Sequence, residues 1–155
     1  MSNIFIYILV TIAAFAGMEV IAWFTHKYIM HGLLWRLHKD HHNKESKGFF
    51  EHNDFFFLIF AIPGVICLLV GMRQGYNFIF WIGMGITLYG LAYFLVHDIF
   101  IHQRFKIFRN TNNRYFKAIR RAHKVHHKHL DKEEGECFGM LWVPFKYLKS
   151  SNKTL

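Results

Sequence analysis

The sequence contains only two cysteines in 155 residues. Cys67 lies in a long apolar stretch and Cys137 in a polar tail, so we expect them to be too far apart to bridge. The scarcity of cysteine therefore excludes a small fold held together by disulfides.

Charge is almost absent from three long stretches. Residues 4–24 contain a single charged side chain, Glu19, and residues 55–72 and 78–96 contain none. Each stretch is close to the roughly 20 residues that a helix needs to cross a bilayer. We predict one domain, residues 1–155, with membrane spans at about residues 4–24, 55–72 and 78–97.

The first stretch has no basic segment before it and no small-residue cleavage site, so we expect it to remain as a span and not to be removed as a signal peptide. Pro63-Gly64 in the second stretch predicts a kink, and a re-entrant hairpin is the alternative there. The small residues Gly83 and Thr87, like Ala13 and Gly17, are four apart and either let helices approach closely or face lipid.

Acidic residues are also few, with 10 Asp and Glu against 19 Lys and Arg. No fold signature accompanies this basic balance, so we do not expect a nucleic-acid partner. Eighteen of the 19 basic residues lie between the first two spans or after the third, which places those segments in the cytoplasm by the positive-inside rule. We therefore expect a protein of the bacterial inner membrane whose basic flanks contact anionic lipid.

Histidine, in contrast, is abundant and regularly spaced. Ten of the twelve histidines form two pairs five residues apart and two triplets with the spacing i, i+3, i+4. Such a triplet lies on one face of a helix, so its three imidazoles can aim at a common point and form half of a metal site. The pairs are His26 with His31 and His97 with His102; the triplets are His38, His41, His42 and His123, His126, His127. His52 and His129 lie outside this pattern and are expected at the surface.

The spacing of the pairs does not suit an ordinary α-helix. Residues five apart are turned by roughly 140° from each other on a straight helix. Either the helix ends, bends or bulges between them, for example through a π-bulge, or the two histidines serve different ions. Each pair directly follows a predicted span, so all four clusters should meet on the cytoplasmic side. The predicted fold is an all-α integral membrane helical bundle, with a histidine-rich helical cap formed by residues 25–54 and 98–155.

Ten imidazoles are more than one structural zinc requires, because such a zinc takes four ligands and usually includes thiolate. Two ions are the natural division, and imidazole suits iron, copper, nickel and zinc alike. A site at the mouth of an apolar bundle indicates a lipid-soluble substrate with unactivated C–H bonds, so we interpret the metal as iron that activates O₂. A non-catalytic metal transporter or store is the other class, but apart from Glu19 the spans offer no polar path for an ion.

Acidic and aromatic residues near the clusters are candidates for supporting roles. Asp40, Asp98 and Glu45 could accept hydrogen bonds from the ligating imidazoles. Glu19, an acid inside a span, could bond a histidine or the backbone, carry protons, or be structural. The residues that we expect to line the approach of the substrate are Trp23, Tyr28, Phe94, Phe100 and Trp142.

The sequence around the histidines also resembles a known family. Its motifs are residues 26–32 (HKYIMHG), 35–42 (WRLHKDHH), 97–104 (HDIFIHQR), 122–127 (AHKVHH) and 136–144 (ECFGMLWVP). From about Trp23 to Pro144 they resemble the bacterial β-carotene hydroxylases of the fatty acid hydroxylase superfamily. Members of this superfamily are often drawn with four spans, whereas this sequence offers three.

The resemblance implies a non-haem di-iron monooxygenase in which the ten clustered histidines hold two Fe ions. It implies O₂ as co-substrate, with two electrons from a ferredoxin-type donor, and hydroxylation at C3 of each β-ionone ring of a carotenoid substrate. β-Carotene would pass through β-cryptoxanthin to zeaxanthin. The same centre acting on another lipid, such as a fatty acyl chain or a sterol, is the alternative. Arg120, Arg121 and Lys124 could dock an acidic ferredoxin.

Overall fold

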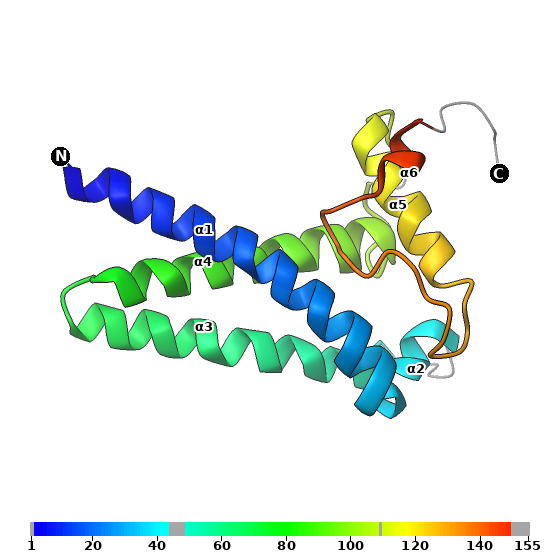
Figure 1. Ribbon diagram of the computed structural model, residues 1–155, viewed down its shortest axis with the longest axis horizontal. Helices are drawn as coiled ribbons and strands as arrows, with labels where there is room; N and C mark the ends of the chain where they lie inside the picture. The colour runs from blue at the N-terminus through cyan, green and yellow to red at the C-terminus, as the bar shows by residue number, and fades with distance from the viewer. Residues whose placement is uncertain (1, 44–48, 109, 150–155) are drawn as a thin grey trace.

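The computed structural model describes residues 2–43, 49–108 and 110–149, and within these ranges every regular element is helical. Three long helices form a shaft (Figure 1). They are α1 (Ser2–Phe24), α3 (Phe55–Arg73) and α4 (Phe78–Tyr93). Together with the segments that continue them, they give three helices that are long and apolar enough to cross a membrane: Asn3–Leu33, His52–Arg73 and Phe78–Ile101. The all-α fold is thereby confirmed, and each predicted span coincides with one of these three helices.

Helix α4 packs against both α1 and α3, and glycines make this close approach possible. A Cβ on Gly83 would lie 2.7 Å from the backbone nitrogen of Leu68 on α3, and one on Gly85 would lie 2.5 Å from the carbonyl oxygen of Thr11 on α1. A Cβ on Gly17 would meet nothing within 4 Å. Of the small residues singled out in the sequence, Gly83 therefore serves a helix contact and Gly17 does not.

Helix α3 continues through Pro63 as one element from Phe55 to Arg73. The re-entrant hairpin suggested as an alternative for this segment is therefore wrong. Gly64 beside the proline packs against α4, where the side chain of Ile86 would lie 3.0 Å from an added Cβ. Contact with a neighbouring helix thus supports α3 where the proline removes a backbone donor.

The cap is built at the end of the shaft that is opposite to the N-terminus and the α3–α4 turn (Figure 1). Its elements are η1 (Thr25–Leu33), α2 (Trp35–Asn43), η2 (His52–Asp54), η3 (Phe94–Ile101), α5 (Arg114–His126) and α6 (Phe145–Lys149). Asn113 caps the start of α5, where its side chain accepts hydrogen bonds from the amides of Tyr115 and Phe116. Its buried face packs on Val143, which holds the C-terminal segment against the cap. Cys67 in α3 and Cys137 after α5 are both free.

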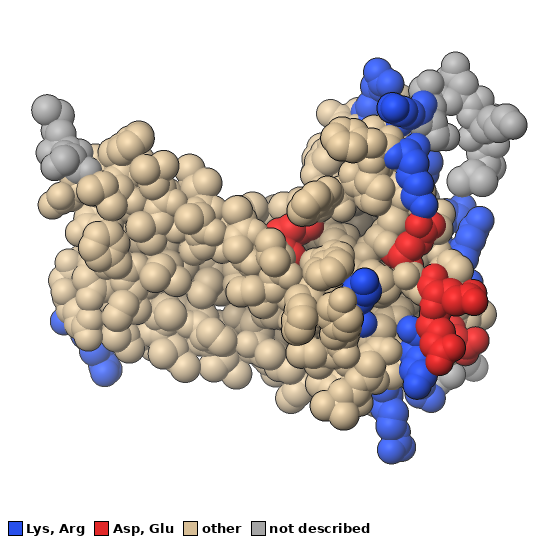
Figure 2. Space-filling view, viewed as in Figure 1, with Lys and Arg blue, Asp and Glu red and all other residues tan. Residues whose placement is uncertain are grey.

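The surface of the shaft is apolar. Side chains such as Ile12, Val65 and Leu91 expose half or more of their area on three different helices. Figure 2 shows that on this face most Lys and Arg side chains gather around the cap, while the shaft is largely uncharged. An exposed apolar band of this extent requires a lipid environment. The chain is therefore an integral membrane protein.

Candidate metal centre

The two histidine pairs lie on π-helical segments. His26 and His31 lie on η1, and His97 lies on η3 with His102 at its end. The amide of His102 donates to the carbonyl of His97, five residues back, at 2.9 Å. The π-helix brings residues five apart onto one side, which an α-helix does not do. Of the alternatives that the spacing of the pairs left open, the structure has the π-helical one.

Nine of the ten clustered histidines fall into two groups, and within each group one ring nitrogen per residue lies within 4.8 Å of the others. Group A consists of His26, His31, His38, His42 and His126; group B consists of His41, His97, His102 and His123. Each group combines histidines from the front and the rear half of the chain. The ring of His127 lies between the groups, with its centre 4.5 Å from that of His123 and 4.6 Å from that of His42. The tenth histidine is thus within the same cluster of rings.

The triplets are divided between the groups, although the sequence suggested that each would aim at a common point. On α2, His38 and His42 belong to group A while His41 belongs to group B. On α5, His123 belongs to group B and His126 to group A. Residues on one face of a helix still diverge by tens of degrees, so a helix that lies between two sites can supply both of them.

The outer nitrogens of group A are all held by uncharged acceptors. Each Nδ1 lies 2.6–3.1 Å from an oxygen: the carbonyl of Phe138 for His26, of Lys132 for His31, of His129 for His42 and of Glu136 for His126, and Oδ1 of Asn53 for His38. Such oxygens only accept hydrogen bonds, so each Nδ1 carries the proton. Each neutral ring therefore presents its Nε2 lone pair to the centre of the group.

The inner nitrogens of group A are too close together for groups that cannot donate. Nε2 of His38 lies 3.1 Å from Nε2 of His26 and 3.2 Å from Nε2 of His42, and the Nε2 atoms of His31 and His126 are 3.2 Å apart. Two lone pairs that face each other at this distance repel, unless a cation lies between them. The donor set, neutral imidazoles fixed from outside, suits a transition-metal ion.

Carboxylates support group B. His41 Nδ1 lies 2.7 Å from Glu51 Oε2, and His97 Nδ1 lies 3.0 Å from Asp98 Oδ1. Nε2 of His41 is buried and has no hydrogen-bond partner in the described part of the chain. A buried, unpaired acceptor that points into a cluster of imidazoles is the arrangement expected of a metal ligand.

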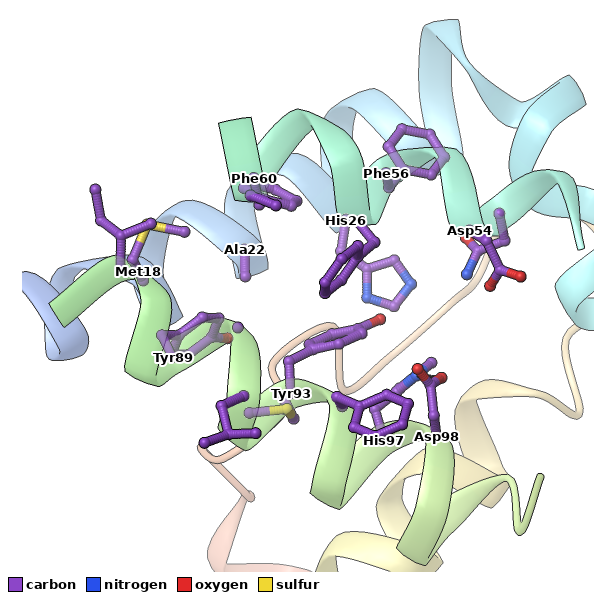
Figure 3. Close-up of a pocket in the computed structure, with 18 of the residues that line it drawn as sticks. Met18, Ala22, His26, Asp54, Phe56, Phe60, Tyr89, Tyr93, His97 and Asp98 are labelled. Carbon is purple, nitrogen blue, oxygen red and sulfur yellow. Dashed lines mark hydrogen bonds and ion pairs between the residues drawn. The ribbon is translucent and has the colours of Figure 1, made fainter. Parts of the chain in front are cut away.

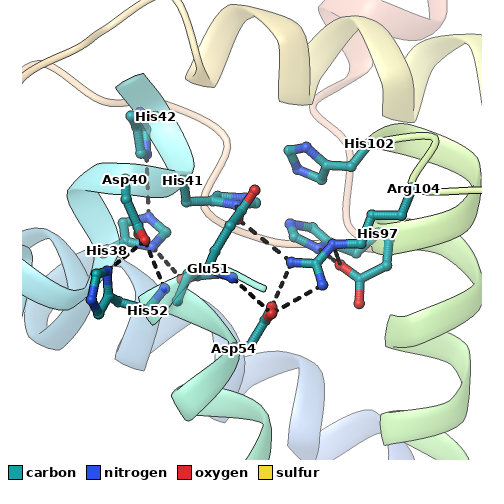
Figure 4. A network of polar contacts seen from close by, with 12 residues as sticks. His38, Asp40, His41, His42, Glu51, His52, Asp54, His97, His102 and Arg104 are labelled. Atoms are coloured by element: carbon teal, nitrogen blue, oxygen red, sulfur yellow. Dashed lines mark hydrogen bonds and ion pairs between the residues drawn. The ribbon is translucent and has the colours of Figure 1, made fainter. Parts of the chain in front are cut away.

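Arg104 connects these carboxylates (Figure 4). Its guanidinium donates two hydrogen bonds to Asp54, one of them at 3.1 Å, and lies 3.5 Å from Glu51 and 3.9 Å from Asp98. Arg104 thus joins the segment that follows η3 to the start of α3. This polar network holds Glu51 and Asp98, the carboxylates that contact His41 and His97, in place relative to each other.

Burial determines the protonation of the histidines in the cap. The pKa values of His38, His41, His42, His123 and His126 all lie below the ordinary 6.5, that of His42 at about 4. The largest cause is the loss of solvation of the charged form, and neighbouring imidazoles lower each pKa further. At neutral pH these rings are uncharged and able to bind a metal.

The acidic residues singled out in the sequence have different places. Asp98 contacts His97, as described above. Asp40 accepts hydrogen bonds from the amide and the ring of His52, at 2.6 and 2.8 Å, instead of from a clustered histidine. Glu19 accepts hydrogen bonds from backbone amides of the C-terminal segment. Glu45 lies outside the described residues. His52 has an exposed side chain, whereas His129 is half-buried.

Sequence reasoning missed Glu51, Asn53 and Arg104. Glu51 and Asn53 belong to a short polar run, residues 51–54, immediately before an apolar span, and that position was the available signal. Four histidines of group A are held by backbone carbonyls. These left no signal in the sequence, because every residue has a backbone carbonyl whatever its side chain.

A cavity of about 500 Å³ leads from the shaft to both groups (Figure 3). His26, His97 and His123 lie at one end with Tyr93, whose ring stacks on that of His97 at 4.5 Å between centres. Elsewhere the walls are mostly apolar, with Met18, Ala22, Phe56, Phe60, Val65 and Ile86 among them. Cavities of this size and character hold small or elongated apolar molecules.

Of the five aromatic residues that we expected to line the approach of the substrate, one lines this cavity. Phe94 lines the cavity, and the lining does not include the other four. Trp23 and Tyr28 form an edge-to-face pair on the surface of the first span, Phe100 is buried against Phe116, and Trp142 is 75% exposed.

The fatty acid hydroxylase family matches this chain over residues 11–148. A protein of Pseudescherichia vulneris named beta-carotene hydroxylase is 42% identical over 135 residues, which cover 87% of this chain and 76% of that protein. A protein of the same name from Pantoea ananas is 41% identical over 136 residues, covering 88% and 77%.

A plant protein is similar over an even larger part of the chain. Beta-carotene hydroxylase 1, chloroplastic, of Capsicum annuum is 36% identical over 146 residues, which cover 92% of this chain and 45% of that protein. No solved structure matches. The family match extends from α1 to α6 and includes all ten clustered histidines. The chain belongs to the fatty acid hydroxylase family.

Proposed function

We propose that this protein is a β-carotene 3-hydroxylase, a non-haem di-iron monooxygenase of the membrane. It hydroxylates C3 of the β-ionone rings and forms zeaxanthin by way of β-cryptoxanthin. The observation that carries the proposal is the apolar cavity that ends at both histidine groups. The similarity to proteins named beta-carotene hydroxylase supports the choice of substrate.

The cavity suits one end of a long hydrocarbon. Its apolar walls bind a ring and the adjoining part of the chain by excluding water from them. The cavity walls on the lipid side, Phe57 and Val65 from α3 and Leu91 from α4, are about half exposed. The remainder of the carotenoid leaves between these helices and stays in the bilayer.

When bound, a pair of ferrous ions would supply the chemistry that inserts one oxygen atom of O₂ into a C–H bond, while two electrons from a donor and two protons convert the second oxygen atom to water. The residues of the chain have the tasks of binding and orientation. Group A and group B hold the ions, while Asn53, Glu51 and Asp98 fix the protons of three ligands on Nδ1. Phe138 and Met140 cover the cavity from the C-terminal segment and keep water from the reacting carbon.

We place the cap in the cytoplasm of a bacterium whose inner membrane holds the three spans, because 18 of 19 Lys and Arg lie in the segments that form or flank the cap. A ferredoxin-type donor would dock there. The guanidinium groups of Arg120 and Arg121 bond the backbone carbonyls of Phe100 and Tyr147, so they serve the fold. The exposed Lys124 remains the best docking candidate of the three proposed from the sequence.

Expression in a host that accumulates β-carotene tests the activity. The intact chain should yield β-cryptoxanthin and zeaxanthin, and His38→Ala, His97→Ala and His127→Ala should each abolish both while the protein stays in the membrane. His129→Ala is the matched control, because it removes an imidazole outside both groups and keeps the carbonyl that contacts His42. The control should retain activity.

Metal analysis of the purified active protein tests the cofactor. Two irons per chain are expected. Hydroxylation by a protein that holds zinc and no iron would refute the di-iron assignment. Unchanged carotenoid together with a hydroxylated or desaturated acyl chain or sterol would mean that the substrate is another lipid.

The salt dependence of turnover tests the docking of the electron donor. Turnover with ferredoxin should fall as salt is raised, and a rate that is independent of salt would contradict docking on basic residues.

A further inference from the structure

The two histidine groups differ in the charge of their outer partners. The Nδ1 atoms of group A face four backbone carbonyls and the amide oxygen of Asn53, all of which are uncharged. In group B, His41 and His97 face the carboxylates of Glu51 and Asp98. The negative charge of the centre is therefore concentrated beside group B.

Arg104 does not cancel this charge. Its single guanidinium lies among three carboxylates. It donates hydrogen bonds to Asp54 and lies 3.5 Å from Glu51 and 3.9 Å from Asp98. Arg104 and its three acidic partners each expose less than a third of the side chain, so solvent screens their charges only partly. The sum leaves excess negative charge next to His41 and His97.

A carboxylate that accepts a hydrogen bond from Nδ1–H makes the imidazole a stronger donor to a metal. It also stabilises a more highly charged ion by direct electrostatic attraction. Two of the three histidines that line the cavity, His97 and His123, belong to group B.

We propose that the two iron ions are unequal, and that the ion held by group B is oxidised first because Glu51 and Asp98 support its ligands. The inference rests on the proposed di-iron function. In a stepwise oxidation, Fe(II) in group B becomes Fe(III) and one electron passes to the added oxidant, ferricyanide, which becomes ferrocyanide. The Nδ1 protons remain on His41 and His97. The iron in group A loses its electron in a second step at a higher potential.

Stepwise oxidation of the full-length protein in detergent tests this order. The protein is loaded with ⁵⁷Fe and titrated with ferricyanide, and Mössbauer spectra give the ferric and ferrous fractions at each potential. Two separate one-electron steps are expected. Glu51→Gln and Asp98→Asn keep the shape and an oxygen acceptor but remove the charge, so each should raise the potential of the first step more than that of the second.

Asn53→Asp is the converse variant, since it places a carboxylate against His38 of group A. It should lower the potential of the second step and narrow the gap between the two. Equal shifts of both steps in Glu51→Gln, or a shift confined to the first step in Asn53→Asp, would overturn the inference.

Iron content separates this inference from the proposed function. If Glu51→Gln weakens binding, loss of one iron with retention of the other at an unchanged potential supports the assignment, and loss of both together contradicts it. A wild-type protein with two irons that hydroxylates β-carotene but is oxidised in one unsplit step refutes only the inequality. A wild-type protein without iron refutes both proposals.

Discussion

The carboxylate of Glu19 on α1 accepts a hydrogen bond from the backbone amide of Leu141 at 2.8 Å, across 122 positions of the sequence. The same oxygen accepts hydrogen bonds from the amides of Met140 and Trp142 at 3.0 and 2.8 Å, and the other oxygen accepts one from the Tyr89 hydroxyl at 2.8 Å. An acid inside a membrane span thus anchors the C-terminal segment to the shaft. The same segment supplies the carbonyls that fix two histidines of group A.

Replacing Glu19 by Ala should therefore loosen a distant segment. Hydrogen bonds to charged groups contribute about 1.5–3 kcal/mol each, so the amides of Met140, Leu141 and Trp142 should exchange with deuterium at least ~10-fold faster. Iron should be held about 10–100-fold more weakly, because His26 and His126 lose fixed partners.

Tyr89→Phe is the matched control for Glu19→Ala. It removes one of the four hydrogen bonds to Glu19 and leaves the three amide contacts in place. It should change amide exchange and iron retention much less. Exchange rates that are the same in wild type and Glu19→Ala would refute the anchoring role.

The glycine contacts of α4 give a prediction about the stability of the shaft. A Cβ at Gly83 would lie 2.7 Å from Leu68 N and 2.8 Å from Cys67 Cβ, so Gly83→Ala must push α3 and α4 apart. We expect a loss of about 1–3 kcal/mol, seen as a lower melting temperature in detergent.

Gly17→Ala is the control on α1, because a Cβ there meets nothing within 4 Å. It should be neutral or stabilise the helix by up to about 1 kcal/mol. Equal destabilisation by both changes would mean that the effect comes from replacing glycine itself and not from the helix contact.

The sequence predicted those parts of the centre that depend on local periodicity. Charge-free stretches located the spans, and a spacing of five that is unsuitable for an α-helix indicated the π segments. The charge distribution also indicated that all four clusters would meet at one end. These inferences succeed because helices are fixed mainly by neighbours in the chain.

The parts that depend on distant contacts could not be predicted. Glu19 reaches amides 121–123 positions away, and Arg104 bonds Asp54 across 50 positions. The division of each histidine triplet between two groups depends on how α2 and α5 lie relative to each other. Spacing along one helix fixes which side chains share a face but not which of two neighbouring sites each one reaches.

Acid should release the metal and destabilise the metal-free protein. The pKa of His42 is lowered to about 4 in the fold, chiefly by burial, while an unfolded histidine has about 6.5. Between these values the unfolded chain binds a proton that the folded chain excludes, so stability is full above pH 6.5 and falls as the pH falls. His42 alone contributes about 1.4 kcal/mol per pH unit within this window.

Melting of the metal-free protein between pH 8 and pH 4 tests this expectation. His42→Gln should flatten the pH dependence below 6.5, because it removes one excluded proton. His129→Ala, outside both groups, should leave the slope nearly unchanged. A wild-type melting temperature that rises as the pH falls from 7 to 5 would contradict the sign of the effect.

Filling the cavity should stop the reaction without disturbing the metal. Gly90 lines the cavity on α4, and a Cβ added there meets nothing within 4 Å. The side chain of Gly90→Phe can therefore enter the space proposed for the carotenoid ring. We expect turnover of β-carotene to fall at least ~10-fold, since loss of correct placement by about 1 Å costs about 10²-fold, while iron content and melting temperature stay close to wild type.

Gly17→Phe controls for the added aromatic ring, because Gly17 also has open space around it but does not line the cavity. This variant should keep wild-type turnover. If Gly90→Phe hydroxylates β-carotene at the wild-type rate with two irons bound, the ring of the substrate does not occupy this cavity. Its path to the histidine groups would then have to run outside the space between α1, α3 and α4.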